Sequence, residues 1–135
     1  MRCIEISVPE GILNGDLEVP RGAKALILFA HGSGSSRNSS RNKQVAEVLQ
    51  KHGLATLLFD LLTLKEETSE AGGEYRFNIE LLAKRLVLAT QWARSLGLKI
   101  GYFGASTGAA AALKASTETE VFAIVSRGGR PEAEY

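Results

Sequence analysis

The chain has 135 residues, of which 44% are hydrophobic and 23% charged, and its formal net charge is +1. This length and composition are typical of one folded domain, here residues 1–135, and the small net charge argues against nucleic acid or a membrane surface as a partner. Cys3 is the only cysteine, which excludes an intrachain disulfide and a cysteine zinc cluster. Because no segment resembles a signal peptide or a transmembrane helix, we expect a cytoplasmic protein, without metal or cofactor.

The N-terminal segment predicts an antiparallel hairpin. Apolar and polar residues alternate over 4–8, as in a strand with one buried face, and a turn at 9–11 leads into a second strand over 12–19. Asn14 and Gly15 could instead form the tight hairpin turn, but the residues between the 9–11 turn and this pair are too few for a strand. We therefore favour a bulge at Asn14 and Gly15.

From residue 25 onward, buried strands and amphipathic helices alternate. Continuous apolar runs typical of strands covered on both faces occur at 25–30, 55–59, 99–103 and 121–125. Helical patterns lie at about 45–52, from Asn78 to about Leu96 where Gly97 follows, and from Thr107 to about Ser116. The first helix is expected to pack through Val45, Val48, Leu49 and His52. Residues 31–40 and 63–76 are predicted to be a Gly/Ser/Asn-rich loop and a polar surface segment.

This order of elements predicts an α/β fold, with a mostly parallel sheet of about six strands, an N-terminal antiparallel hairpin and helices on both faces. The run at 121–125 has the pattern of a buried strand, yet no apolar segment follows to cover it. An uncovered apolar edge strand is a liability that proteins normally hide. We therefore expect a second copy or a complementing chain to cover it, or residues 1–135 to be the front part of a longer protein.

The most informative motif is GASTG at 104–108, with Ser106 at its centre. It lies between a predicted buried strand and an alanine-rich predicted helix, which is the context of a G-x-S-x-G nucleophile elbow. Small residues at 104 and 108 allow the tight turn, and the helix that begins at Thr107 directs its free N–H groups toward the serine. A Gly- and Ser-rich turn without a catalytic role is the alternative. The context favours Ser106 as a nucleophile, with the Thr107 N–H as an oxyanion donor.

A second candidate loop, His31-Gly32-Ser33-Gly34, follows the strand at 25–30. In a serine hydrolase of this layout the loop supplies the other oxyanion donor, which we assign to the Ser33 N–H. His31 is a candidate substrate-binding residue, and its position before Ser106 favours a role in holding the loop by hydrogen bonds over a role as the catalytic base. A phosphate-binding loop is the alternative, although the segment lacks the P-loop ending and the dinucleotide fingerprint.

Further polar side chains lie near the ends of the predicted strands. Arg127 and Arg130 follow the last strand and could bind a substrate carboxylate, although solvated arginines are commoner in loops. Asp60 ends the second buried strand, where capping a loop is favoured over facing the active-site crevice. His52 is interpreted as a packing residue, and the acidic pair at 66–67 as part of a solvated face.

Several segments resemble the dienelactone-hydrolase-like branch of the α/β-hydrolase family. These are HGSGSS at 31–36, FDLLT at 59–63, GASTGAAAAL at 104–113 and VSRGGRP at 125–131. The resemblance covers nearly the whole chain and implies hydrolysis of a carboxylic ester or lactone, with Ser106 as nucleophile and the N–H groups of Ser33 and Thr107 as the oxyanion hole. It also implies that an Asp and a His follow on later strands, whereas this sequence has no histidine after Ser106. Some similar domains occur fused to a phosphoribosyltransferase.

The leading hypothesis is therefore a serine hydrolase for a small-molecule ester or lactone that is very slow or inactive as residues 1–135 alone. The alternative is a non-catalytic α/β module that self-associates through its last strand.

Overall fold

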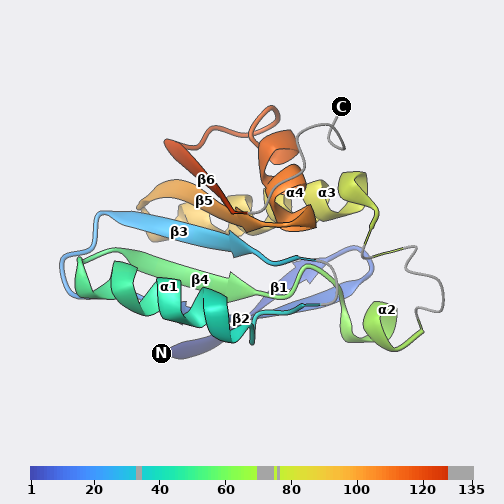
Figure 1. Cartoon of the computed structure of the whole chain (residues 1–135), viewed down its shortest axis with the longest axis horizontal. Coiled ribbons are helices and arrows are strands. Elements are labelled where there is room, and N and C mark those ends of the chain that lie inside the picture. The colour runs from blue at the N-terminus through green and yellow to red at the C-terminus, as the bar shows by residue number, and fades with distance from the viewer. Residues whose placement is uncertain (33–34, 70–74, 76, 128–135) are drawn as a thin grey trace.

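The computed structural model describes residues 1–32, 35–69, 75 and 77–127. An antiparallel hairpin is followed by alternating strands and helices (Figure 1). The strands are β1 (Arg2–Val8), β2 (Gly11–Glu18), β3 (Ala25–Ala30), β4 (Ala55–Phe59), β5 (Lys99–Ala105) and β6 (Ala123–Arg127). The helices are α1 (Ser40–Lys51), α2 (Leu64–Ser69), α3 (Ile79–Ala93), the 3-10 helix η1 (Arg94–Leu96) and α4 (Thr107–Ala115). Across the described residues, each helix is too short or too polar to span a bilayer.

The strands of the described part form one mixed sheet in the order β1-β2-β4-β3-β5-β6. β2 pairs antiparallel with β1 and β4, and the remaining pairs are parallel. This arrangement confirms the predicted fold class. From β3 the chain first reaches β4 on one side and later β5 on the other. Such a reversal of strand order opens a crevice at the carboxyl ends of the strands, where α/β proteins bind ligands.

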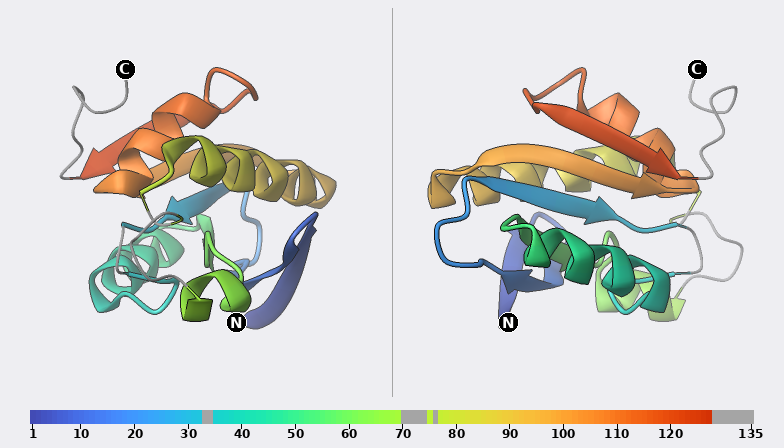
Figure 2. Two further views of the ribbon diagram at one scale, coloured as in Figure 1. Left: turned by 90° about the vertical axis from the view of Figure 1, so that its right-hand side faces the viewer. Right: turned by 60° about the vertical axis from the view of Figure 1, so that its left-hand side comes forward.

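Helices cover both faces of the sheet: α1 lies on one face, and α3 and α4 lie on the other (Figure 2). Alternate residues of β3 and β4 therefore enter different cores. Leu28 and Leu57 join the larger core with α3 and α4, whereas Ile27, Phe29 and Leu58 join the smaller core under α1. Burial on both faces explains why these strands appear in the sequence as continuous apolar runs.

The predicted boundaries of α3 are confirmed by its capping contacts. The Asn78 side chain accepts a hydrogen bond from the Leu81 N–H at 3.1 Å, which makes Asn78 the N-cap. At the other end, η1 terminates at Gly97, whose φ of 74° is in the left-handed region.

The predicted bulge at Asn14 and Gly15 is wrong. β1 and β2 pair in an unbroken register, with Ile4 opposite Gly15. A Cβ atom on Gly15 would lie 3.1 Å from side-chain atoms of Ile4, Leu57 and Phe59. The glycine therefore serves close packing across the strands and not a change of direction.

The packing face of α1 also differs from the prediction. Val48 and His52 are exposed, whereas Asn42 and Ala46 are buried. Helical spacing alone marks Val48 as a packing residue, but the sheet lies under a neighbouring stripe of the helix. Asn42 is buried in the first turn, where its side chain accepts a hydrogen bond from Arg127 at the end of β6.

Within the predicted polar surface segment, the structure forms the short helix α2. Its Glu66 is buried and not solvated, which corrects the prediction for this residue. The Glu66 carboxylate receives two hydrogen bonds from the buried Arg85 guanidinium, at 2.8 and 2.6 Å. A segment that is polar in sequence therefore contributes Glu66 to a buried ion pair with Arg85.

The last strand, β6, is an exposed edge. It begins at Ala123 instead of residue 121, and among the described residues it pairs with β5 alone. Phe122 and Val125 are 55% and 54% exposed, so the predicted full burial of this run is wrong for the described part of the chain. The apolar pattern predicts the strand correctly, but it carries no information on the element that would cover it.

Candidate active site

Ser106 lies at the sharp turn between β5 and α4, at the carboxyl end of the parallel strands (Figure 1). Its backbone has φ 57° and ψ −123°, and no other non-glycine residue in the described ranges has a positive φ. Residues with a side chain rarely adopt this conformation, which costs about 1–3 kcal/mol of strain. The Ser106 residue is exposed despite the buried residues on either side of the turn. This is the geometry of a nucleophile elbow.

Glycines allow three backbone segments to meet at Ser106. A Cβ on Gly104 would lie 2.6 Å from the backbone of α4, and a Cβ on Gly108 would overlap the carbonyl group of Ala30 at the end of β3. A Cβ on Gly32 would lie 2.9 Å from the Ser106 Cβ. The glycines thus bring the loop after β3 against both the start of α4 and the Ser106 side chain.

His31 is buried behind this loop, and both of its ring nitrogens are hydrogen-bonded. Nε2 accepts from the Leu61 N–H at 2.9 Å, and Nδ1 donates to the Gly32 carbonyl at 2.9 Å. These partners require the neutral imidazole with its proton on Nδ1. Burial lowers the pKa of His31, and the bond to Gly32 and the charge of Asp60 only partly oppose this effect. The hydrogen bonds match the loop-holding role predicted from the sequence.

Arg127 ends β6 beside the elbow. Its carbonyl accepts a hydrogen bond from the Ser106 N–H at 3.1 Å. Its guanidinium donates to the Asn42 Oδ1 at 3.1 Å and lies over the Phe103 ring, 5.9 Å from the ring centroid. Sequence reasoning missed Asn42 and Phe103. The available signal for Asn42 was its place in the first turn of a helix that directly follows the loop after β3.

A hollow of about 350 Å³ lies beside Ser106. It is bounded by the loop after β3, the first turn of α1 and the ends of β5 and β6, and Gly32, Asn42 and Arg127 are among its lining residues. Among the described residues that line it, none is acidic and none is a histidine. Of the residues predicted from the sequence, the structure thus brings Ser106 and Arg127 to one hollow, while His31 stays behind the loop.

Of the two predicted oxyanion donors, the structure describes Thr107 but not Ser33. Thr107 is the first residue of α4, so its N–H lies at the positive end of a helix next to Ser106. The Thr107 Oγ1 is buried and has no hydrogen-bond partner in the described part of the chain. Ser33 lies outside the described residues, and its role as the second donor stays a prediction.

Asp60 follows β4 and contacts Arg37 in the connection between β3 and α1. Its carboxylate accepts a hydrogen bond from the Arg37 N–H at 2.8 Å and pairs with the Arg37 guanidinium. Arg37 Nε also lies 3.5 Å from an Asp16 carboxylate oxygen. The contacts match the predicted loop-capping role, and they occupy the Asp60 carboxylate.

Neither histidine of the sequence is placed as a base for Ser106. His31 has no free ring nitrogen. His52 lies beyond the last turn of α1, at the opposite end of that helix from Asn42, and its Nδ1 donates to the Val48 carbonyl at 2.9 Å. The elbow and the hollow are therefore present in the described residues without an imidazole to accept the serine proton.

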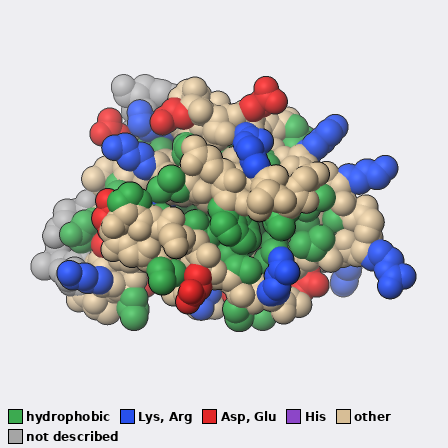
Figure 3. Space-filling model, turned by 180° about the vertical axis from the view of Figure 1, so that it is seen from behind, with side chains coloured by type: hydrophobic (Ala, Val, Ile, Leu, Met, Phe, Trp, Pro, Cys, Tyr) green, Lys and Arg blue, Asp and Glu red, His purple; other side chains and the backbone are tan. Residues whose placement is uncertain are grey.

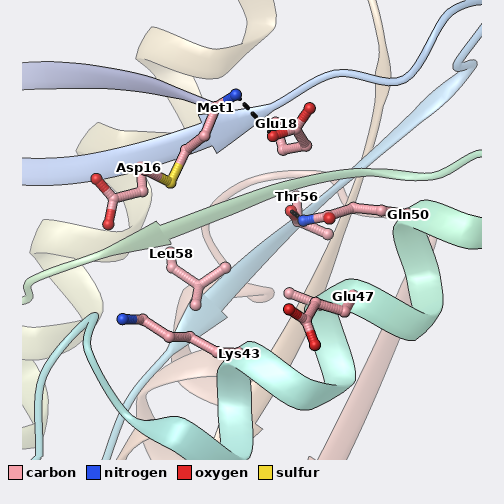
Figure 4. Close-up of a pocket in the computed structure, with 9 residues that line it drawn as sticks. Met1, Asp16, Glu18, Lys43, Glu47, Gln50, Thr56 and Leu58 are labelled. Atoms are coloured by element: carbon pink, nitrogen blue, oxygen red, sulfur yellow. Dashed lines mark hydrogen bonds and ion pairs between the residues drawn. The ribbon is translucent and has the colours of Figure 1, made fainter.

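A second hollow, of about 290 Å³, lies between α1 and strands β2 and β4 (Figure 4). Its charged side chains include Asp16, Lys43 and Glu47, and the N-terminal ammonium pairs with Glu18 at 2.8 Å. None of the described residues that line it is a serine, cysteine or histidine. The hollow beside Ser106 is the candidate active site because the exposed elbow serine lines it.

No protein-family model matches the chain. Among solved structures, the dienelactone hydrolase of Anabaena variabilis is 54% identical and superposes with a TM-score of 0.93, covering 98% of this chain and 65% of that chain. The chain has an α/β-hydrolase fold. An esterase of Pyrococcus furiosus shares this fold at 24% identity with a TM-score of 0.77, covering 95% of this chain and 50% of that one. The similarity to dienelactone hydrolase predicted from the motifs is confirmed.

Two curated proteins of Mycobacterium tuberculosis, both named "Putative phosphoribosyl transferase", are also 54% identical to this chain. The match covers 87% of the chain but 27% of each relative, so the chain spans about a quarter of their length. It likewise spans 65% of the Anabaena structure. The transferase name belongs to the whole relatives.

Proposed function

We propose that this chain carries the nucleophile of a serine hydrolase that cleaves a carboxylic ester or lactone through an acyl-enzyme on Ser106. The observation that carries the proposal is the strained, exposed conformation of Ser106 between β5 and α4. Backbone strain of this kind gathers at functional sites, and here it presents a hydroxyl at the mouth of a hollow. The 54% identity to dienelactone hydrolase supports the same reaction class.

In the proposed reaction, Ser106 Oγ attacks the ester carbonyl carbon while a base takes the hydroxyl proton. The carbonyl oxygen becomes an oxyanion, which the N–H groups of Thr107 and Ser33 would stabilise. The ester C–O bond then breaks, and the leaving oxygen receives the proton from the base. A water molecule attacks the acyl-enzyme in the same way, releasing the acid and restoring the serine.

We further propose that the base and its carboxylate partner come from outside residues 1–135, either from a longer chain or from a complementing one. His31 and His52 form hydrogen bonds with other groups, and the sequence has no histidine after Ser106. A serine without its base loses several powers of ten in rate, while the oxyanion donors keep some acceleration over water. The chain alone should therefore react at Ser106 slowly.

The proposal is tested by intact-mass analysis after treatment with a fluorophosphonate serine probe, with and without added imidazole as a substitute base. We expect one adduct per chain that forms faster with imidazole, is absent from Ser106→Ala and is retained in Ser95→Ala. Ser95 is an exposed serine in η1, so its variant controls for nonspecific reaction. The proposal is overturned if the folded chain stays unlabelled with imidazole, or if Ser106→Ala is labelled equally.

A further inference from the structure

The loop after β3 is tied at two points to the residues that follow β4. At the start of the loop, His31 Nε2 accepts a hydrogen bond from the Leu61 N–H at 2.9 Å. Further along, the Arg37 N–H donates to the Asp60 carboxylate at 2.8 Å, and the Arg37 guanidinium pairs with the same carboxylate. We call these contacts of His31 and Arg37 with Asp60 and Leu61 the loop clamp. Two consecutive residues after β4 therefore hold the loop at both of its ends.

The two residues that anchor the loop clamp are themselves fixed. The Leu61 carbonyl accepts a hydrogen bond from Arg85 of α3 at 3.2 Å, and the Asp60 N–H donates to the Asn14 carbonyl of β2 at 2.8 Å. Leu61 and Asp60 are both buried. Because a buried polar network whose members are bonded holds a single geometry, the loop clamp ties the loop to a rigid part of the fold.

Gly32 follows His31 directly and touches the elbow. A Cβ atom on Gly32 would lie 2.9 Å from the Ser106 Cβ and 3.1 Å from the Ala105 carbonyl oxygen. The Gly32 carbonyl accepts hydrogen bonds from His31 Nδ1 at 2.9 Å and from the Ser35 N–H at 3.1 Å. Gly32 also lines the hollow beside Ser106. A displacement of His31 would therefore move the backbone that borders the serine.

The polar character of His31 is not needed to fill space. The ring is buried, and burial of polar ring nitrogens is costly unless they are hydrogen-bonded. An apolar side chain could fill the same volume without that cost, but it could not accept a hydrogen bond from the Leu61 N–H. The presence of an imidazole is therefore explained by the position that it gives to the loop.

We infer that His31 and Asp60 are positioning residues for the reaction at Ser106, because the loop clamp holds the Gly32 backbone against the elbow. Neither side chain takes a proton from the serine or touches the reacting atoms in this role. The inference rests on the proposed function, since it concerns the rate at which Ser106 reacts. Misplacement of a group by about 1 Å can slow an enzymatic reaction by about 100-fold. Loss of the loop clamp should therefore slow the reaction even in a chain that stays folded.

Two substitutions of His31 separate its two hydrogen bonds. In His31→Gln an amide oxygen reaches the place of Nε2 and can accept from the Leu61 N–H, whereas the shorter side chain of His31→Asn reaches the place of Nδ1 and can serve Gly32 alone. The measurement is the second-order rate constant of fluorophosphonate labelling at Ser106 in the presence of imidazole. We expect this constant to fall by at least about tenfold in His31→Asn and to stay within about threefold of wild type in His31→Gln.

Substitutions of Asp60 test the second point of the loop clamp and cover the case in which His31→Asn does not fold. Asp60→Ala removes both contacts with Arg37 and should also slow labelling by at least about tenfold. Asp60→Asn keeps an oxygen for the Arg37 N–H but loses the ion pair. Its labelling rate should therefore lie between those of Asp60→Ala and wild type.

Thr90→Val is the matched control for a loss of stability. The Thr90 hydroxyl is buried, donates to the Leu86 carbonyl at 2.7 Å and bonds to the Tyr102 hydroxyl at 2.6 Å. Loss of these hydrogen bonds should lower the free energy of unfolding, measured by urea denaturation. Because Thr90 has no part in the loop clamp, the labelling rate of Ser106 should not change.

The inference is overturned if His31→Asn and Asp60→Ala fold and are labelled as fast as wild type. It is also overturned if Thr90→Val slows labelling as much as they do, since labelling would then follow stability and not the position of the loop. Equal slowing in His31→Gln and His31→Asn would show that the bond to Leu61 is not what matters, and would overturn it too. An unlabelled wild-type chain overturns the proposed function as well, whereas a labelled wild type with equally reactive variants overturns this inference alone.

Discussion

At the scale of single residues, the strained backbone of Ser106 leads to a stability prediction. Glycine adopts positive φ without the cost that a Cβ imposes, and such strain is worth about 1–3 kcal/mol. We therefore expect Ser106→Gly to have a free energy of unfolding about 1 kcal/mol above that of Ser106→Ala, measured by urea denaturation. Both variants lack the hydroxyl, so their difference reports the backbone alone.

Ser116 provides the control, because its φ of −66° and ψ of −15° are helical. There, glycine should be less stable than alanine by about 0.5–1 kcal/mol, the opposite sign to that at Ser106. Equal stabilities of the glycine and alanine variants at both positions would contradict the view that the elbow is strained.

The sequence predicts the site residues whose role is local and misses those whose partner is distant. The elbow at Ser106 and the loop at His31 are contiguous motifs next to strands, and they lie where the pattern places them. Asn42 and Glu66 are polar residues in helices, for which exposure is the usual expectation. Their burial depends on Arg127 and Arg85, which are far away in the sequence. Such pairings follow from the fold and leave no periodic signal.

At the scale of secondary-structure elements, Arg85 of α3 connects this helix to the segment from Leu61 to Glu66 and to the turn between β1 and β2. Its side chain is 1% exposed, and the guanidinium donates to Glu66 of α2, to the Leu61 carbonyl at 3.2 Å and to Glu10 at 3.1 Å. Arg85→Met would leave the Glu66 carboxylate buried without its partner. We expect the free energy of unfolding at pH 7 to fall by about 3–5 kcal/mol. The exposed neighbour variant Lys84→Met should cost less than about 1 kcal/mol.

The pH dependence of the same pair gives an independent check. Burial alone would raise the pKa of Glu66, but the hydrogen bonds from Arg85 and Thr63 and the charge of Arg85 outweigh burial and hold it below its ordinary value of 4.5. The pair therefore stabilises the fold above that pH, and its contribution is lost as the pH falls through the lowered pKa. In Arg85→Met the carboxylate gains from protonation, so the difference between variant and wild type should shrink on acidification. A difference that is constant from pH 7 to pH 4 would contradict this account.

Elements with their own local signals are the ones that sequence reasoning predicts. Strands β3, β4 and β5 appear as apolar runs because both of their faces are covered, and α3 has its cap at Asn78 and its stop at Gly97. α2 was missed, since its amphipathic character depends on one buried glutamate. The sequence also predicts the hairpin, but it cannot tell a glycine that is needed for close packing between strands, such as Gly15, from one that is needed for a bulge.

At the scale of the whole molecule, charge is evenly mixed while apolar surface is not. Figure 3 shows the molecule from behind, where both acidic and basic side chains surround an area of hydrophobic side chains. At the edge of the sheet, exposed apolar side chains lie at Phe122, just before β6, and at Val125 within it. An exposed apolar edge strand offers both unpaired backbone groups and hydrophobic surface to another chain.

We propose that copies of this chain pair through β6, and we expect dimers whose fraction rises with protein concentration in sedimentation equilibrium. Val125→Lys should shift the chain to monomers, because a lysine at an edge strand opposes strand pairing. Val48→Lys is a matched control, since Val48 is 55% exposed on α1 against 54% for Val125 on β6, and it should leave the association unchanged. A wild-type chain that stays monomeric at all concentrations, or equal effects of the two lysines, would rule out β6 as the contact.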